Sequence, residues 1–299
     1  MIKVSVLIPT YGRYESLLKT LNSLLRQSYS DYEILLIDQN KEMKKEALDL
    51  IERNAGKVRR IKVDYIGGTR ARNEGLLLAQ GEIIICCDDD IEAGEDFIEN
   101  HAKNYTDPRV GGVAGGVVTG HDTPVFSRQK VGVIRKLDGK VISNFNAGFR
   151  IEVEHAWGCN MSFLRRLLIE AGGFDERLEG TQSFLEPQVC FSIRRLGYKI
   201  VFDPTARARH LHASAGGCRG MDFPEMMFWY YHNFMIFYLT HMGKIFFPIF
   251  LTRQIAGIFR RAIVTKDFKV IFSGMKGLVR GFADYFNKGA ILRGAGRQA

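Results

Sequence analysis

The first ninety residues alternate between two hydrophobic patterns. Strands are predicted at residues 3–9, 32–38, 59–65 and 82–88, and all but the third contain an unbroken apolar stretch ("VLI", "ILLI" and "IIICC") that is typical of strands buried on both faces. Between them, apolar residues recur every three or four positions, which predicts helices. The alternation of strand and helix predicts an α/β fold with a mainly parallel sheet flanked by helices. Ligands of such sheets bind beyond the carboxyl ends of the strands.

The middle of the chain is less regular. The run "VGGVAGGVVTG" at residues 110–120 predicts a glycine-rich strand and turn, because it lacks the strand–turn–helix context of a dinucleotide-binding loop. Helical spacing predicts helices over residues 161–170 and 187–196, each followed by glycine. Residues 198–204 predict one more strand.

The last part of the chain has a different composition, and we predict a first domain over residues 1–220 and a helical region over residues 221–299. Residues 223–251 are dense in aromatic residues and methionine, but polar residues interrupt every run long enough for a spanning helix. The formal net charge of +9 is concentrated near the C-terminus, because ten Lys or Arg and only two acids lie between residues 252 and 299. An aromatic stretch before a basic tail favours helices that lie on a membrane surface. The alternative is a helical cap packed on the first domain.

Composition also bears on partners and compartment. The five cysteines form no CxxC pair, so a reducing cytoplasm is the expected compartment. The N-terminal apolar run is too short for a signal peptide, and Pro9 and Gly12 interrupt it. No nucleic-acid-binding module accompanies the basic tail, so we expect no nucleic acid partner. The expected location is cytoplasmic and peripheral, on the inner face of the cell membrane.

Three consecutive aspartates, Asp88, Asp89 and Asp90, follow directly after the buried run "EIIICC". Clustered carboxylates repel one another unless a cation neutralises them, and oxygen ligands suit Mg²⁺ or Mn²⁺. Asp88 and Asp90, two positions apart, can serve one metal ion. The alternative is a solvated acidic turn that precedes a helix. The segment Pro9–Tyr11 and Asp38 end two other predicted strands, so we expect them at the same edge of the sheet.

Several motifs in order resemble family 2 glycosyltransferases with the GT-A fold, of the type that builds bacterial cell-surface polysaccharides. They are "VSVLIPTYGRYESLLKTLNSLLRQSY", "YEILLID", "RARNEG", "GEIIICCDDDI", "WGCNMSFLRR", "AGGFDE" and "RRLGYKIVFDP". The resemblance covers residues 3–212. It implies an inverting, metal-dependent transfer of a sugar from a nucleotide-diphosphate donor to a saccharide or lipid-linked saccharide acceptor. It also implies Mg²⁺ or Mn²⁺ on the diphosphate.

The resemblance implies a role for individual residues of the first domain. Asp90, Asp88 and His210 are expected to approach the metal, with Asp88 also near the ribose. His212 is a weaker candidate, on the same face as His210 if the strand continues. The residues expected to bind the nucleotide sugar are Pro9, Thr10, Tyr11, Asp38, Arg72, Asn73, Asp88, Asp89, Trp157 and Arg219. Trp157 has an alternative role as a core residue.

The general base implied by the family is an acid shortly after "GGFDE", and in this chain the position falls on Glu186. A carboxylate there can take the proton of the acceptor hydroxyl. The surrounding sequence departs from the family, since Leu185 precedes Glu186 and Gln188 follows it. The alternative is an acid that only starts a helix before Pro187. Two rival functions stay open at this point: a nucleotidyltransferase, and a sugar-nucleotide-binding or glycan-binding module without catalysis.

Overall fold

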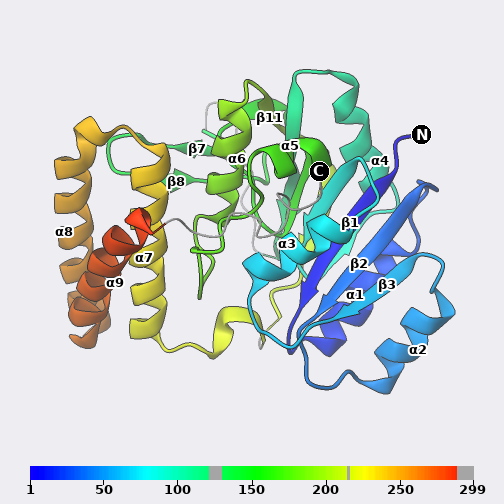
Figure 1. Cartoon of the computed structure of the whole chain (residues 1–299), viewed down its shortest axis with the longest axis horizontal. Helices are drawn as coiled ribbons and strands as arrows, with labels where there is room; N and C mark the ends of the chain where they lie inside the picture. Colours follow the sequence, from blue (N-terminus) through cyan, green and yellow to red (C-terminus); the bar gives the residue numbers. More distant parts are fainter. Residues whose placement is uncertain (121–129, 214–215, 288–299) are drawn as a thin grey trace.

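The computed structural model describes residues 1–120, 130–213 and 216–287. A nine-stranded sheet lies at its centre, with helices on both faces (Figure 1). The strand order is β3-β2-β1-β4-β10-β6-β11-β5, and β9 pairs with β11. The strands of this sheet are β1 (Val4–Thr10), β2 (Tyr32–Asp38), β3 (Val58–Lys62), β4 (Ile83–Cys87), β5 (Ile91–Ala93), β6 (Val110–Val118), β9 (Ile151–Val153), β10 (Asn160–Leu164) and β11 (Lys199–His210). A separate hairpin is formed by β7 (Val133–Ile134) and β8 (Val141–Ile142).

Nine α-helices and three short 3₁₀ helices complete the described part of the chain. The α-helices are α1 (Tyr14–Leu24), α2 (Lys45–Arg53), α3 (Gly68–Leu78), α4 (Phe97–Ala102), α5 (Arg165–Glu170), α6 (Leu185–Arg195), α7 (Phe223–His241), α8 (Phe247–Thr265) and α9 (Lys269–Phe286). The 3₁₀ helices are η1 (Lys103–Thr106), η2 (Gly217–Gly220) and η3 (Lys244–Phe246).

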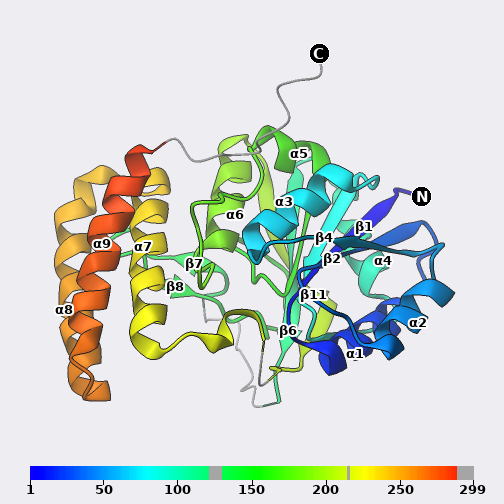
Figure 2. The same cartoon turned by 60° about the horizontal axis from the view of Figure 1, so that its bottom comes forward.

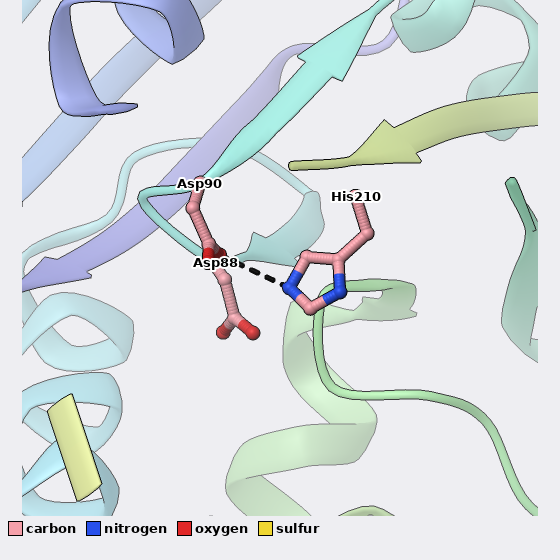
Figure 3. A group of neighbouring side chains, drawn as sticks. All are labelled: Asp88, Asp90 and His210. Carbon is pink, nitrogen blue, oxygen red and sulfur yellow. Dashed lines mark hydrogen bonds and ion pairs between the residues drawn. The ribbon is translucent and has the colours of Figure 1, made fainter. Parts of the chain in front are cut away.

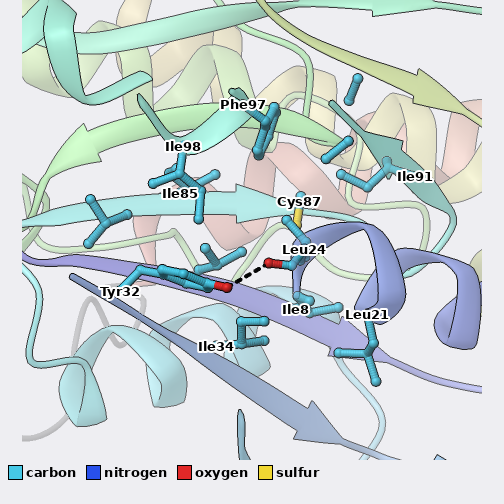
Figure 4. Close-up of a cluster of buried hydrophobic side chains, with 14 of the residues drawn as sticks. Ile8, Leu21, Leu24, Tyr32, Ile34, Ile85, Cys87, Ile91, Phe97 and Ile98 are labelled. Carbon is cyan, nitrogen blue, oxygen red and sulfur yellow. Dashed lines mark hydrogen bonds between the residues drawn. The ribbon is translucent and has the colours of Figure 1, made fainter. Parts of the chain in front are cut away.

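The parallel half of the sheet confirms the strands predicted in the first ninety residues. Strands β1, β2, β3 and β4 are parallel neighbours. Ile8 and Leu7 are both fully buried but lie in different hydrophobic clusters, because successive side chains of a strand point to opposite faces. Ile85 and Cys86 of β4 divide in the same way. Figure 4 shows the cluster that contains Ile8 and Ile85. Burial on both faces explains the unbroken apolar stretches of β1, β2 and β4, whereas in β3, at the edge of the sheet, only Val58 is buried.

The helix predicted over residues 161–170 is wrong in its first half. Residues Asn160–Leu164 form β10, which runs antiparallel between β4 and β6, and only Arg165–Glu170 is helical. On one face of β10 the polar side chains are satisfied by His101, whose ring nitrogens lie 2.8 Å from Asn160 Oδ1 and 2.9 Å from Ser162 Oγ. Burial lowers the pKa of His101 to about 4. Pairing on both edges therefore decides the conformation of this segment against its helical spacing.

The C-terminal region is helical, as predicted. In both views α7 lies between the sheet and the two outer helices α8 and α9 (Figures 1 and 2). Most of α7 is buried, and Phe234 and Phe237 stack on Phe184 of the first domain. Helix α7 is therefore a cap on that domain, whereas the place of a domain boundary at residue 220 stays a prediction. Among the described residues, no helix combines the length and apolar content needed to cross a bilayer.

Candidate active site

A cavity of about 720 Å³ opens beyond the carboxyl ends of β1 and β4. Segments that are distant in sequence line it: the end of β1, the start of α3, the acidic turn after β4, residues 157–159, residues 176–186 and η2. Such a place is where an α/β sheet binds its ligands. The sequence analysis predicted this edge of the sheet as the site.

Asp88, Asp90 and His210 form a cluster that could hold a metal ion, since one ligand atom of each lies within 4.8 Å of the others (Figure 3). Both aspartates belong to the turn between β4 and β5, and His210 is the last residue of β11. The antiparallel pairing of β5 with β11 places His210 opposite Ile91, next to Asp90. Strand pairing therefore brings His210 close to Asp88, which lies 122 positions earlier in the chain. The cluster offers two carboxylates and one imidazole as donors.

The ionisation of this cluster suits a cation. Asp90 is fully buried, and burial alone would raise its pKa. The hydrogen bond and charge of His210, Arg13 and the amide of Ala213 outweigh burial, and together they hold the pKa of Asp90 below its usual range. His210 Nε2 lies 3.1 Å from Asp90 Oδ1, whereas its buried Nδ1 has no partner among the described residues. Nδ1 of His210 is therefore available to bind a ligand.

Asp89 points away from the metal cluster and supports the strand end. Its carboxylate accepts hydrogen bonds from Thr10 Oγ1 at 2.8 Å and from Arg13 Nη1 at 3.1 Å. Burial raises the pKa of Asp89 to about 6, against the opposing charge of Arg13. Arg13 also lies 3.3 Å from Asp90 Oδ2. Arg13 was not predicted, because nothing in its local sequence shows that it reaches the acids after β4.

Arg72 orients Asp88 from α3, on the other side of the acidic turn. Its Nη2 lies 3.0 Å from Asp88 Oδ1, and its Nη1 donates to Gln182 Oε1 at 3.0 Å. The buried Nε has no partner among the described residues. Gln182, in left-handed backbone geometry with φ 53°, was also not predicted, since it lies in an irregular segment 110 residues from Arg72.

Glu186 lies in the first turn of α6 and lines the same cavity. Burial is the main cause that raises the pKa of Glu186 above its usual range, and the charge of Arg72 opposes it. Gly158 lies against this carboxylate so closely that an added Cβ would collide with Glu186 Oε1. A carboxylate of raised pKa in a cavity has the properties of a general base. The glycine at position 158 leaves the space that this carboxylate occupies.

Replacing Gly158 by alanine should therefore displace the Glu186 carboxylate. The collision involves only the end of a flexible side chain, so we expect little change in the melting temperature. A shift of about 1 Å at a catalytic group can lower kcat by about 10²-fold. Gly148→Ala is the matched control, because no atom lies within 4 Å of its added Cβ. Steady-state kinetics of the two variants check this prediction, and equal kcat values would contradict it.

The remaining predicted residues divide into two groups. Pro9, Tyr11 and Trp157 line the cavity, as do Arg72, Asp88 and Asp89. Trp157 is 36% exposed and its ring centroid lies 6.3 Å from that of His210, so its alternative role as a core residue is wrong. His212 lies beyond the end of β11, so the strand does not continue to it. Arg219 belongs to η2, but its side chain lies outside the described part of the structure.

Thr10, Asp38 and Asn73 are buried and are not among the residues that line the cavity in the described structure. Arg60 donates two hydrogen bonds to Asp38 Oδ2, at 2.9 and 2.7 Å. Asn73 binds the loop after α5 through Phe174 O at 2.8 Å. Thr10 and Asn73 each bind a residue that lines the cavity, Asp89 for Thr10 and Glu176 for Asn73. A direct contact of these three with a nucleotide stays a prediction.

Comparison with known proteins bears on what this cavity does. The family model described as glycosyl transferase family 2 matches residues 5–171, more than half of the chain. The chain belongs to glycosyl transferase family 2. This matched segment contains the end of β1, the start of α3 and all three aspartates. The protein is therefore a glycosyltransferase that uses a nucleotide-sugar donor, and the two rival functions are set aside.

Relatives and solved structures agree with this membership. Over 223 residues the glycosyltransferase is 27% identical to the glucosyl-dolichyl phosphate glucuronosyltransferase of Haloferax volcanii, covering 70% of this chain and 69% of the relative. Over 150 residues it is 29% identical to the poly(ribitol-phosphate) β-N-acetylglucosaminyltransferase TarP of Staphylococcus aureus, covering 47% of this chain and 46% of TarP. The mannosyltransferase PcManGT of Pyrobaculum calidifontis, solved with GDP-Man and Mn²⁺, superposes with a TM-score of 0.56 over 96% of this chain and 88% of PcManGT. At 15% identity that likeness concerns the fold, which is of the predicted GT-A type.

Proposed function

We propose that this glycosyltransferase moves a sugar from a nucleotide-diphosphate donor to a hydroxyl of a saccharide acceptor, with inversion at the anomeric carbon. The observation that carries the proposal is the presence of two separate groups of acids at one cavity, which Asp88 and Glu186 line. Asp88 and Asp90 belong to the cluster with His210, and the pKa of Asp90 is lowered. Glu186 stands apart from this cluster, and its pKa is raised. Groups whose pKa values are driven in opposite directions suit different roles in one reaction.

In the proposed reaction, Glu186 accepts the proton of the acceptor hydroxyl while the hydroxyl oxygen forms its bond to the anomeric carbon. The bond from that carbon to the diphosphate oxygen breaks at the same time, and the bonding electrons leave with the nucleoside diphosphate. A single displacement of this kind inverts the configuration, since the nucleophile enters opposite the leaving group. Arg72 holds Asp88 in place and adds positive charge to the donor side. Trp157 offers an exposed ring to a sugar.

The residues present fit a divalent metal ion. Two carboxylates and one imidazole form a mixed oxygen and nitrogen donor set, which suits Mn²⁺ better than Mg²⁺. When bound, such an ion neutralises negative charge on the departing diphosphate. Two structural neighbours support the assignment, since GalNAc-T7 was solved with UDP, GalNAc and Mn²⁺, and PcManGT with GDP-Man and Mn²⁺.

The raised pKa of Glu186 has a consequence for the pH dependence of the reaction. Only the ionised carboxylate can accept a proton, so kcat falls as the pH falls through the pKa of Glu186. Because burial raises that pKa, we expect the acid limb at a pH above the ordinary range of glutamate. A profile of kcat from about pH 4 to pH 8 with saturating Mn²⁺ checks this. A flat profile down to the usual glutamate pKa would contradict the assignment of Glu186.

We further propose a saccharide carried on a lipid as the acceptor, in the synthesis of a cell-surface polysaccharide at the inner face of the cell membrane. Names of relatives support this setting. The Haloferax relative is named for glucosyl-dolichyl phosphate, and two shorter matches are named for the biosynthesis of amylovoran and of colanic acid. In this proposal residues 1–220 carry the reaction, and residues 221–299 provide peripheral contact with the membrane.

A donor panel tests the proposed reaction. UDP-, GDP- and dTDP-sugars are incubated with the full chain and Mn²⁺, with and without a short saccharide acceptor. The expected result is release of the nucleoside diphosphate from one donor class, accelerated by acceptor and abolished by chelator. Binding of a donor without any release or transfer would overturn the proposal.

A further inference from the structure

The outward sides of α8 and α9 carry large apolar side chains in contact with solvent. On α9 and the residue before it, Phe268, Phe272 and Val279 are 65%, 79% and 67% exposed. On α8, Phe259 and Ile263 are 47% and 68% exposed. Positions 268, 272, 279, 282 and 286 fall on one side of a helix of 3.6 residues per turn. We call the exposed apolar side chains of α8 and α9 the outer face.

The orientation of the outer face is fixed by glycines on the opposite side of α9. An added Cβ at Gly277 would collide with the backbone oxygen of Phe228 in α7, and one at Gly281 with that of His232. The glycine side of α9 is therefore the only side that allows so close an approach to α7. The phenylalanine side must point away from the protein, and its exposure follows from the packing of the helix.

The two outer helices contact one another at one end through aromatic rings. The ring centroids of Phe247 in α8 and Phe282 in α9 lie 6.5 Å apart, and those of Phe282 and Phe286 lie 5.3 Å apart. The two helices also pack on one another through Ile258 and Gly274. The exposed apolar side chains that share one side of α9 differ from the scattered single residues of an ordinary protein surface, and such groups mark sites of interaction.

Positive charge accompanies the outer face. The basic residues between positions 244 and 287 are Lys244, Arg253, Arg260, Arg261, Lys266, Lys269, Lys276 and Arg280. The acids of this range are Asp267 and Asp284, and both have partners within the protein. Two of the bases are paired as well, Arg253 with Asp138 and Arg280 with Asp284. Asp267 accepts from the amide of Lys269 at 3.0 Å, and Asp284 pairs with His232 and Arg280. On α9, positions 269, 276 and 280 follow one edge of the apolar side, by the same helical geometry.

We propose that the outer face is the surface with which this enzyme lies on an anionic lipid bilayer. Exposed aromatic side chains bordered by bases match the composition of helices that rest between headgroups and acyl chains. A second copy of the chain fits less well, because a twofold interface brings the same positively charged surfaces together. The inference deepens the membrane contact proposed above, and the binding that it describes does not depend on sugar transfer.

Helices α7 and α9 hold one wall of the cavity. Asn233 of α7 donates to Glu179 O at 2.8 Å, and Trp229 of α7 packs against Gly180. Arg177 donates to Tyr285 O at the end of α9, at 3.2 Å. Glu179 and Gly180 both line the cavity. A bilayer under the outer face would thus sit at a fixed position relative to this wall, which suits an acceptor that is anchored in lipid.

Vesicle binding of the full chain tests the proposal. The probes are vesicles of phosphatidylcholine alone and of phosphatidylcholine with about 30% phosphatidylglycerol. We expect binding to the anionic vesicles that weakens at high salt. Phe272→Ser with Val279→Ser should weaken it by about tenfold or more, and Lys269→Gln with Lys276→Gln by about fivefold for each lysine removed. The control for charge is Lys41→Gln with Lys45→Gln at the other end of the molecule (Figure 1), and that for apolar area is Leu77→Ser.

Each outcome is informative. Two results would overturn the proposal. One is that the parent chain does not bind anionic vesicles, and the other is that both double variants bind them as tightly as the parent chain does. A dimer in sedimentation analysis that Phe272→Ser dissociates would assign the outer face to a second copy. Circular dichroism confirms that the variants are folded. Donor release without vesicles should be equal in the parent chain and the variants, so failure of the proposed reaction would be seen separately from failure of membrane binding.

Discussion

Replacing Glu186 by glutamine should lower kcat for sugar transfer by about 10²–10⁴-fold, the range by which a general base contributes. Glutamine keeps the size of the side chain but cannot take the proton of the acceptor hydroxyl. The metal cluster and Arg72 are untouched, so we expect donor affinity to change little. Single-turnover kinetics and donor titration of Glu186→Gln measure the two quantities separately.

The matched control is Glu179→Gln, because Glu179 lines the same cavity but is exposed. That variant should keep kcat within about threefold of the parent enzyme, as expected for a charge that is well solvated. If Glu186→Gln retained the parent kcat, or if the two variants lost the same activity, another group would have to serve as the base.

Asp90→Ala should lower sugar transfer by about 10³-fold or more, because it removes a charged member of the cluster with Asp88 and His210. A readout independent of activity is the melting temperature, which Mn²⁺ should raise by several degrees in the parent enzyme. In Asp90→Ala this rise should be absent. Chelation should reduce the parent enzyme to the activity of the variant.

Glu92→Gln is the control for Asp90→Ala, since Glu92 lies two residues further along on β5 and is exposed. It should keep both the activity and the Mn²⁺-dependent rise in melting temperature. Because Asp90 is buried beside Arg13 and His210, circular dichroism of Asp90→Ala establishes that the fold persists. Equal transfer rates with and without Asp90, unaffected by chelator, would refute the metal site.

Strands β1, β2 and β4 of the parallel half could be predicted from sequence because they are buried on both faces and contain unbroken apolar stretches. Strand β10 could not. Its residues Asn160 and Ser162 are polar, and their partner His101 lies on α4, about sixty residues earlier. The spacing of Met161, Leu164 and Leu168 then fits a helix as well as a strand. Only pairing with β4 and β6 decides between the two.

The acids were predicted because they end strands, and the ends of strands in this fold converge, whereas His210 was predicted from the resemblance to the family. Arg13 and Gln182 were missed for the opposite reason. Each contributes through a contact with a residue far away in the chain, and its own neighbours in sequence give no signal of that contact. Asp38 shows a further limit, since the sequence places it at the correct edge but does not show that Arg60 already occupies its carboxylate.

The residue that precedes α6 connects the active-site cavity to the C-terminal helices. Phe184 adopts φ 70°, a left-handed conformation that is unfavourable for a bulky residue, two positions before Glu186. Its ring stacks on Phe234 at a centroid distance of 4.3 Å and on Phe237 at 5.4 Å, both in α7. A shortened protein that ended near residue 220 would lack Phe234 and Phe237, the two rings that stack on this phenylalanine. Removing the C-terminal helices to gain solubility would therefore loosen the start of the helix that carries Glu186, the proposed base.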